Sequence, residues 1–388
     1  MNKNRLFQIL SYILVAVMTA AITVSAMVFS GAAARQTSKL QQLENLILNR
    51  YIGEVDQKEM EDAAADAMIE ALGDRWSYYL TAEEYAAHHE QEQNAYVGIG
   101  ITINAQSAQQ GLEVRQVAEG GPAAKAGIQA GDRIIGVDGK RVAGMEVNAI
   151  QAMIKGDEKT QVTLTVLRDS EELTVTVTRA AVSVPVATGK MLENNIGLVT
   201  IENFNANCAK ETISAIDTLL QEGAKKLIFD VRNNPGGRVS ELVEVLNYLL
   251  PEGVLFRSQD HTGKEEQETS DAACLEIPMA VIVNENSFSA AEFFAAALQE
   301  RDWAEVVGEK TSGKGNYQVL FKLSDGSAVG LSIGKYFTPK GVSLEGVGIT
   351  PDAVVPVDRE TASAIYAGIL NPEEDPQILA AIEVLKVQ

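Results

Sequence analysis

The sequence between Val186 and Asp352 alternates short, strongly apolar stretches with amphipathic ones. Ile196–Ile201, Lys226–Val231 and Met279–Val283 have the length and composition of buried strands. Amphipathic stretches follow them, and in Ala209–Gln221 the apolar side chains recur at helical spacing. Repeated strand–loop–helix units restrict this region to a layered α/β domain. In such domains, functional groups gather at the loops that follow the strands.

A shorter region, from Tyr96 to about Arg179, has a different pattern. Apolar and polar residues alternate, with glycine-containing breaks, in five stretches: Gly98–Ile103, Leu112–Val117, Arg133–Val137, Gln161–Arg168 and Glu172–Thr178. Such alternation is typical of strands. Pro122–Gly127 and Val147–Ile154 have helical spacing instead. The pattern predicts a compact domain of mixed α and β structure.

The N-terminus has the pattern of a membrane anchor. Lys3 and Arg5 precede an uncharged stretch from Leu6 to Ala34, and its core of about 20 strongly apolar residues matches a bilayer-spanning helix. Positive charge before the span predicts a cytoplasmic N-terminus. A cleaved signal peptide is the alternative, because Ala32–Ala34 offers suitably small residues. In both cases we expect the body to work on the extracytoplasmic side of a bacterial plasma membrane.

Two further segments are predicted to be helical. From Leu40 to about Glu92, apolar residues recur at helical spacing over two or three helices, with a break near Gly73–Tyr79. A helical tail closes the chain at Pro372–Gln388. We interpret the first segment as a spacer, and both segments as candidates for forming a homo-oligomer.

Composition narrows the possible functions. The formal net charge is −21 and Lys and Arg form no cluster, which excludes a nucleic-acid-binding surface. Cys208 and Cys274 lie far apart and match no metal-binding spacing. We interpret them as two buried thiols, with a disulfide as the alternative in an oxidising compartment.

A serine-containing turn follows the predicted strand Met279–Val283. Its sequence is Ser287-Phe288-Ser289-Ala290-Ala291-Glu292, and a helix is predicted from Ala290 to Glu300. A hydroxyl at such a turn can act as a nucleophile, because the first N–H groups of the helix favour developing negative charge. The alternative is an ordinary N-cap serine.

A serine nucleophile needs a base. His88 and His89 adjoin in the acidic helical segment, and His261 lies in a polar loop, so a Ser–His–Asp triad is not expected. Lys314, between two glycines, is the candidate, because burial can lower the pKa of a lysine toward neutrality. The alternative is a surface lysine in a turn.

The loop Asn233-Asn234-Pro235-Gly236-Gly237 follows the predicted strand Lys226–Val231. Consecutive glycines expose backbone N–H groups, so this loop can contribute to an oxyanion hole. A plain connecting loop is the alternative.

Taken together, five ordered segments resemble the carboxy-terminal processing peptidases, also called tail-specific proteases. They are Asp230–Gly237, Val283–Glu292, Val307–Gly315, Lys335–Pro339 and Gly348–Asp352. The resemblance implies a multidomain α/β protein with a layered, crotonase-like protease core. With the signal-anchor that the N-terminal pattern predicts at residues 1–35, the expected order is a helical segment at 36–95, a PDZ domain at 96–179, a serine protease core at 180–356 and a helical tail at 357–388.

The resemblance also implies roles for single residues. The family nucleophile precedes the motif glutamate by three residues and therefore falls on Ser289. The family base falls on Lys314, and Gln318 occupies the place of a glutamine that orients the lysine in some members, with Glu292 as the alternative orienting group. The implied oxyanion donors are Ala290 and one glycine of the Pro-Gly-Gly loop: Gly236 or Gly237.

Two residues depart from the family pattern. Small residues usually surround the serine, whereas Phe288 is bulky, and Ala291 replaces a common serine. Neither change removes a catalytic group, so activity is still expected.

Residues 96–179 resemble a PDZ domain. The carboxylate-binding loop implied by this resemblance is Tyr96-Val97-Gly98-Ile99-Gly100, whose N–H groups would hold a terminal carboxylate while the peptide adds as a strand. Gly120–Gly127 and Gly131-Asp132 match the usual loop and turn of the module.

The expected function is a serine endopeptidase that cleaves exported or membrane-associated proteins near apolar C-termini held by the PDZ domain. No metal or cofactor is expected. One alternative is an inactive, membrane-anchored PDZ scaffold that binds C-termini. A lyase or isomerase is a second alternative, since related layered cores host acyl-CoA chemistry, although a PDZ domain has no obvious use there.

Overall fold

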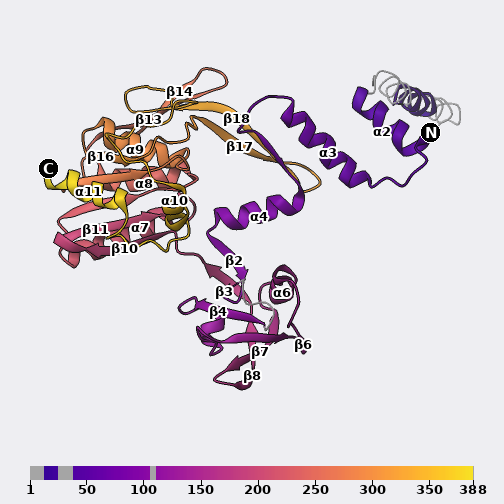
Figure 1. The fold of residues 1–388 in the computed structure, drawn as a ribbon. Coiled ribbons are helices and arrows are strands. Elements are labelled where there is room, and N and C mark those ends of the chain that lie inside the picture. Colours follow the sequence, from indigo (N-terminus) through magenta and orange to yellow (C-terminus); the bar gives the residue numbers. More distant parts are fainter. Residues whose placement is uncertain (1–12, 25–37, 105–110, 388) are drawn as a thin grey trace, which may run out of the picture. The chain divides into compact units, whose positions relative to one another are not determined.

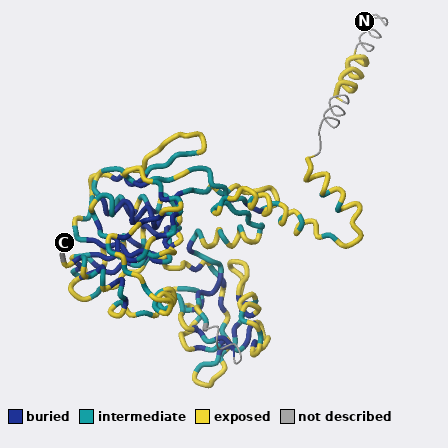
Figure 2. Tube along the Cα trace, turned by 45° about the horizontal axis from the view of Figure 1, so that its top comes forward, coloured by how far each residue is buried: buried dark blue, intermediate teal, exposed yellow. Residues whose placement is uncertain are grey.

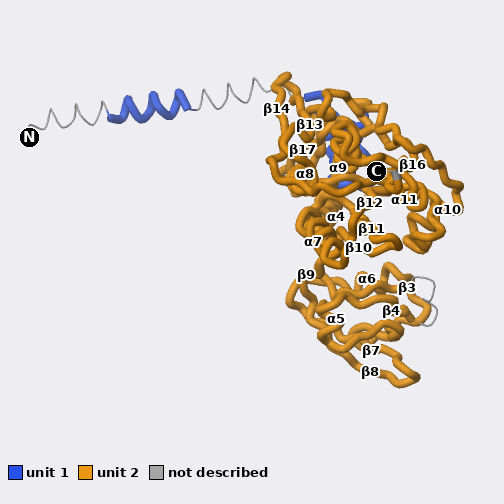
Figure 3. The backbone as a smooth tube through the Cα atoms, turned by 90° about the vertical axis from the view of Figure 1, so that its left-hand side faces the viewer, with its two compact units in different colours: residues 1–71 blue, residues 72–388 orange. Residues whose placement is uncertain are grey.

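The structure is a computed structural model that describes residues 13–24, 38–104 and 111–387. The chain divides into two compact units, residues 1–71 and residues 72–388, which are coloured separately in Figure 3. The larger unit contains every predicted catalytic residue.

The smaller unit is helical. Residues 13–24 form an exposed helix, and α2 (Lys39–Arg50) and α3 (Gln57–Glu70) follow. Ser38 and Asp56 cap these two helices, each accepting a backbone N–H of the first turn. Within the described ranges, no helix is long and apolar enough to cross a membrane. Residues 6–12 and 25–34 of the predicted membrane segment lie outside those ranges.

A six-stranded sheet forms the centre of the larger unit (Figure 1), in the order β10-β11-β12-β15-β16-β19. β10 is antiparallel to β11, and the remaining pairs are parallel. The strands are β10 (Ala187–Leu192), β11 (Ile196–Ile201), β12 (Lys226–Asp230), β15 (Met279–Val283), β16 (Ala304–Gly308) and β19 (Ala353–Val354), with the short helix η2 (Glu193–Asn195) before β11.

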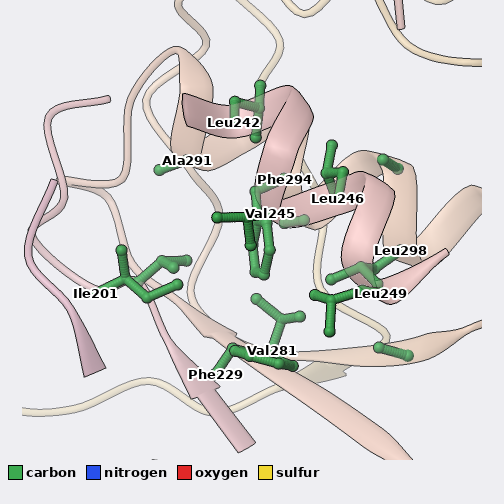
Figure 4. Packing of buried hydrophobic residues seen from close by; sticks show 14 of the residues in the cluster. Ile201, Phe229, Leu242, Val245, Leu246, Leu249, Val281, Ala291, Phe294 and Leu298 are labelled. Atoms are coloured by element: carbon green, nitrogen blue, oxygen red, sulfur yellow. The ribbon is translucent and has the colours of Figure 1, made fainter. Parts of the chain in front are cut away.

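Both faces of this sheet are covered, because successive side chains of a strand point to opposite faces. In β12, Leu227 and Phe229 pack into one cluster and Ile228 into another. The first cluster includes residues of α7 (Cys208–Gln221), α8 (Val239–Leu249) and α9 (Ala290–Glu300), and Figure 4 shows Phe294 of α9 over Phe229 and Val281. The second includes α11 (Pro376–Val387).

A second, five-stranded sheet has the order β1-β18-β13-β14, with β17 also paired to β18. Its strands are β1 (Tyr78–Leu80), β13 (Gly253–Asp260), β14 (Glu265–Ser270), β17 (Asn316–Lys322) and β18 (Ala328–Phe337). The break predicted near Gly73–Tyr79 therefore leads into a strand, which pairs with β18 across about 250 residues of sequence, Tyr78 opposite Gly330. The helix α4 (Ala82–Glu92) follows β1.

The strand-rich region folds around its own core. Its sheet contains β3 (Ile101–Asn104), β4 (Leu112–Val117), β5 (Arg133–Val137), β6 (Lys140–Arg141), β7 (Gln161–Arg168) and β8 (Glu171–Thr178). Two helices, α5 (Pro122–Lys125) and α6 (Val147–Ile154), pack with it, and β2 (Ala95–Gly98) pairs with β9 (Ala180–Ser183). The predicted strand Gly98–Ile103 is thus two strands, separated at Gly100, whose φ is +77°.

Buried residues concentrate in the central sheet and its helices, as the dark segments of Figure 2 show. The predicted helical tail consists of α10 (Arg359–Tyr366) and α11. Cys208 is buried, where burial raises the pKa of its thiol to about 12, and Cys274 is partly buried. Both are free thiols in the structure.

Candidate active site

The loops that follow β12, β15 and β16 carry the candidate catalytic residues. These strands are parallel neighbours, so their carboxyl ends meet at one edge of the sheet. The amide of Phe288 donates to the carbonyl of Asn234 at 3.0 Å and joins the first two loops. The sheet topology therefore explains why residues more than 50 positions apart in sequence lie together.

The two serines of the turn have different environments. Ser287 is fully buried; its hydroxyl donates to the carbonyl of Val231 at 2.8 Å and accepts the amide of Asn284 at 3.1 Å. Ser289 lines a cleft of about 680 Å³. Ser287 therefore stabilises the turn, whereas the side chain of Ser289 is available to a substrate.

Ser289 has an unusual backbone conformation. Its φ is +51° and its ψ is −118° at the N-terminus of α9, a combination that a non-glycine residue adopts only when its surroundings enforce it. Ser289 and Glu292 form a capping box at the start of α9, and among the described residues no hydrogen bond joins the Ser289 hydroxyl to another side chain. Strain of this kind is typical of functional positions.

Two backbone amides near Ser289 have no acceptor among the described residues, and both residues line the cleft: Gly237 and Ala290. The amide of Gly236 donates instead to the side-chain oxygen of Asn234 at 2.8 Å. Gly236 has a steric role as well, since a Cβ there would lie 2.9 Å from Cβ of Ser289 and 3.0 Å from the amide nitrogen of Ala290. The geometry thus favours Gly237 over Gly236 as an oxyanion donor.

Glu292 is fully buried behind Ser289 and connects the two candidate catalytic loops. Its carboxylate accepts the amides of Ser289 at 2.9 Å, Gly313 at 2.8 Å and Lys314 at 2.8 Å. It also accepts the hydroxyl of Thr311 at 2.5 Å. In this structure Glu292 therefore holds the backbone of Lys314, and not its ammonium group.

Lys314 lines the same cleft as Ser289. Burial lowers the pKa of Lys314 below its usual value, and the carboxylates of Glu345, Glu292 and Asp74 only partly oppose this shift. Its ammonium group makes no hydrogen bond to Ser289 within the described part of the chain. It lies 4.9 Å from the centre of the Trp76 ring.

Gln318 also lines the cleft, on strand β17. Its amide nitrogen donates to the carbonyl of Asn316 at 3.1 Å and to the hydroxyl of Ser332 at 3.0 Å. These bonds fix the Gln318 side chain at the cleft, and within the described residues it makes no hydrogen bond to the ammonium group of Lys314.

Three sequence models match the chain. Residues 195–355 match peptidase family S41, residues 113–168 match the PDZ domain, and residues 15–84 match the activating protease CtpB N-terminal domain. The "Probable CtpA-like serine protease" of Staphylococcus aureus strain COL is 34% identical over 349 residues, which cover 87% of this chain and 70% of that protein. The chain belongs to the CtpA-like serine proteases of family S41.

Two further relatives agree with this assignment. The "Probable CtpA-like serine protease" of Staphylococcus haemolyticus is 32% identical, over 91% of this chain and 74% of that protein. A solved structure of a candidate S41 protease from Bacteroides fragilis has a TM-score of 0.51 at 15% identity, over 83% of this chain and 90% of that one. The latter likeness concerns the fold alone. As a member of the family, the chain is a serine peptidase with a PDZ domain.

The PDZ domain of this S41 protease has a groove of its own. A pocket of about 310 Å³ is lined by Tyr96, Gly98, Ile99, Gly100, Ile101, Ile103, Gln151, Ile154 and Lys155. Four of the five predicted loop residues are in this set, and Val97 is not. The groove is lined by residues of β3 and α6, and β3 is the edge strand of its sheet.

Sequence reasoning missed several residues at the cleft of the protease. His88, from α4, lines it, with Nδ1 4.0 Å from a carboxylate oxygen of Glu92, although its place in an acidic helical segment gave no indication of this position. The described residues include no hydrogen bond from His88 to Ser289. Trp76 and Glu345 contact the Lys314 loop. In the sequence, Trp76 stands out only as an aromatic residue in the predicted break near Gly73–Tyr79, and Glu345 only as an acidic residue between two of the matched segments.

Within the described residues, no group of acids, histidines or cysteines is arranged to hold a metal ion.

Proposed function

We propose that the chain is a serine endopeptidase in which Ser289 is the nucleophile and neutral Lys314 the general base. One observation carries this proposal: a serine of strained backbone and a lysine of lowered pKa line one cleft, together with two amides that lack acceptors among the described residues. A lysine base needs a lowered pKa, and a tetrahedral intermediate needs preorganised donors.

The proposed reaction begins when Lys314 takes the proton of Ser289 as Oγ attacks the scissile carbonyl carbon. The carbonyl oxygen becomes an oxyanion, which accepts hydrogen bonds from the amides of Gly237 and Ala290. Protonated Lys314 then gives its proton to the leaving amine, and the peptide bond breaks. Water, deprotonated by Lys314, attacks the acyl-enzyme and releases the carboxylic acid and Ser289. Glu292 positions the lysine through its hydrogen bond to the Lys314 amide, and Gln318, at the same cleft, is proposed to orient the ammonium group during the reaction.

Substrate selection is proposed to depend on the PDZ groove. The pocket along β3 and α6 would hold an apolar C-terminal tail of a protein substrate. We further propose the expected domain limits, an N-terminal signal-anchor within residues 1–35 and an extracytoplasmic catalytic body. Support for the anchor comes from the apolar composition of residues 6–34. A homo-oligomer through the terminal helical segments stays a proposal as well.

The decisive experiment compares the full chain with three variants on an unfolded protein that ends in apolar residues, with fragments identified by mass spectrometry. Ser289→Ala and Lys314→Ala are expected to abolish cleavage, whereas His88→Ala, at the same cleft, should retain it. Cleavage by Ser289→Ala would remove the proposed nucleophile. Loss of cleavage in His88→Ala but not in Lys314→Ala would transfer the role of base to the histidine. Tail binding without cleavage by the unchanged chain would support the scaffold alternative.

The dependence of kcat/KM on pH tests the base separately. Because only neutral Lys314 can accept a proton, activity should fall as the pH is lowered through the pKa of this lysine. Burial lowers that pKa, so the acid limb should lie below the ordinary lysine value of about 10.4. A profile that still rises steeply above that value would contradict the proposed environment of Lys314.

A further inference from the structure

The ammonium group of Lys314 lies on an aromatic ring and not on its proposed partner. Its distance from the centre of the Trp76 ring is 4.9 Å, within the range of a cation–π interaction. Among the described residues no hydrogen bond joins the hydroxyl of Ser289 to Lys314 or to another side chain. In this structure the lysine therefore contacts the indole and makes no hydrogen bond through which it could take the serine proton.

The Trp76 ring is held by the same loop that carries Lys314. The indole N–H donates to one carboxylate oxygen of Glu345 at 2.8 Å. The other oxygen accepts the amides of Gly315 at 2.9 Å and Asn316 at 3.0 Å, directly after the lysine. One carboxylate thus fixes the distance between the indole and the backbone of the Lys314 loop.

The segment of Trp76 is itself anchored. The amide of Trp76 donates to Asp74 at 3.2 Å, Asp74 accepts the hydroxyl of Ser77 at 2.6 Å, and Ser77 accepts the amide of Ser332 on β18 at 3.0 Å. The Trp76 ring also meets the Phe288 ring edge-on, with centroids 6.4 Å apart. Phe288, the bulky departure from the family pattern, directly precedes Ser289 and therefore brings Trp76 into contact with the turn that carries the serine.

We propose that Trp76 is a positioning residue that holds protonated Lys314 in a resting place, and that Lys314 leaves the indole when it loses its proton and turns to Ser289. This inference rests on the proposed role of Lys314 as the base. The physical reason is that an indole face attracts the ammonium ion but not the neutral amine. Loss of the proton and release from Trp76 are thereby coupled.

Several charged groups share the surroundings of Lys314. Burial and Arg75 disfavour the ammonium form, whereas Glu345, Glu292 and Asp74 favour it. Arg75 also lies over the Trp76 ring, with its guanidinium carbon 4.0 Å from the centroid. Removal of the indole should therefore lower the pKa of Lys314, and removal of the exposed Arg75 should raise it.

The test measures the acid limb of kcat/KM against pH in the full chain and four variants. Trp76→Leu removes the ring face and the N–H, and its limb is expected to move to lower pH by about 0.4 to 1.5 units, the range that cation–π strengths imply. Trp76→Phe retains an aromatic face and should move the limb in the same direction but less. Arg75→Gln should move it to higher pH. Trp303→Phe, a change at a tryptophan that packs on the core outside the cleft lining, should leave it in place.

The inference is tested by the pH at which the acid limb of kcat/KM lies, and not by the plateau value of kcat/KM. A purely structural role for Trp76 would lower the plateau in Trp76→Leu and leave the limb unmoved, and that result would overturn the inference. Lys314→Ala distinguishes an error in the proposed base from an error in the proposed resting position. If this variant retains activity, the proposed base is wrong; if it is inactive while Trp76→Leu keeps the wild-type limb, only the resting position is wrong.

A measurement on the unchanged chain covers the case in which Trp76→Leu fails to fold. In protein labelled with ¹³Cε-lysine, the Hε signal that Lys314→Arg removes is expected upfield of the other lysines, because it lies against the indole face. A peptide boronate bound to Ser289 should return that signal toward its ordinary position. An Hε signal without an upfield shift in the free enzyme would also overturn the inference.

Discussion

At the scale of single residues, Glu292 shows how one buried side chain can organise the loops of the candidate catalytic site. Its carboxylate accepts three amides and one hydroxyl from two separate loops. Hydrogen bonds to a charged acceptor are stronger than neutral ones, so the strained conformation of Ser289 and the position of Lys314 depend on the same group. Thr311, which donates to Glu292, also accepts the amide of Ile349 at 2.6 Å and extends the network to a third segment.

We predict that Glu292→Gln lowers kcat by about 10- to 100-fold with little change in KM, because the loop geometry and not substrate binding is affected. The free energy of unfolding should fall by about 2–3 kcal/mol, as expected for the loss of charge-assisted bonds at a buried site. Steady-state kinetics and urea unfolding measure both. Glu285→Gln, an exposed acid of the same loop, is the control; equal effects of both changes would refute the assigned role.

The close approach of Gly236 to Ser289 leads to a second prediction. In Gly236→Ala the new Cβ would lie 2.9 Å from the carbonyl oxygen of Phe288, at a φ of +91°. Displacement of the Ser289 turn should lower kcat by about 100-fold or more, the effect of losing an oxyanion donor. Gly341→Ala has a similar φ, +83°, but open space around it, and should cost only about 1 kcal/mol of stability. An active Gly236→Ala variant would exclude tight packing at this turn.

At the scale of secondary structure, each candidate functional group lies in a loop next to the end of a helix or strand. Ser289 precedes α9, the glycine loop follows β12, and Lys314 precedes β17. Trp76 depends on β1, a strand of only 3 residues that pairs with β18. Such a short strand has little pattern of its own, and it forms because β18 offers a free edge.

The PDZ groove provides a prediction at this scale. Ile101 lines the pocket along β3, whereas Thr102, the next residue, is exposed on the other face. Ile101→Asp should raise KM for a protein with an apolar C-terminus by about tenfold, equivalent to about 1.4 kcal/mol of binding, without affecting a short peptide that lacks the tail. Thr102→Asp should leave both values unchanged. If Ile101→Asp weakens cleavage of both substrates equally, the groove does not select tails.

At the scale of the whole molecule, a buried ion network ties the C-terminal helix to the central sheet. Arg232, two residues after β12, forms ion pairs with Asp230, the last residue of that strand, and with Asp375. Asp375 also accepts two backbone amides at the start of α11. Burial alone would lower the pKa of Arg232, but these two carboxylates raise that pKa above its ordinary value. Ile378, Ala381 and Leu385 of α11 then cover the second face of the sheet. The residue before the glycine loop thus also holds the last helix.

Asp375→Asn should therefore destabilise the molecule without touching the cleft. Removal of one partner leaves a charge buried with less compensation, so the free energy of unfolding should fall by about 3 kcal/mol. The melting temperature by calorimetry measures this. Glu383→Gln, which breaks an exposed pair with Lys386 on the same helix, should change stability by less than about 0.5 kcal/mol. A variant Asp375→Asn as stable as Glu383→Gln would show that the network contributes little.

Local patterns predicted much of the fold. Apolar periodicity alone predicted the observed limits of β11, β15 and α6, because burial of one face dictates the side-chain pattern along each element. The same patterns missed β1, and they joined β2 and β3 into one strand, because short strands depend on their partners more than on their own residues.

The candidate site was determined by the sequence only in part. The motifs identified Ser289, Lys314 and the glycine loop, and the strand–loop–helix pattern indicated that loops after strands would carry them. Tertiary structure alone decided that Ser287 is buried, that the Gly236 amide donates to Asn234 while the Gly237 amide has no acceptor among the described residues, and that Glu292 binds the backbone of Lys314. It also placed Trp76 against Lys314, 238 residues away in sequence. Hydrogen-bond partners and ring contacts depend on which chain segments meet in space, and the periodicity of a single segment contains no information about that meeting.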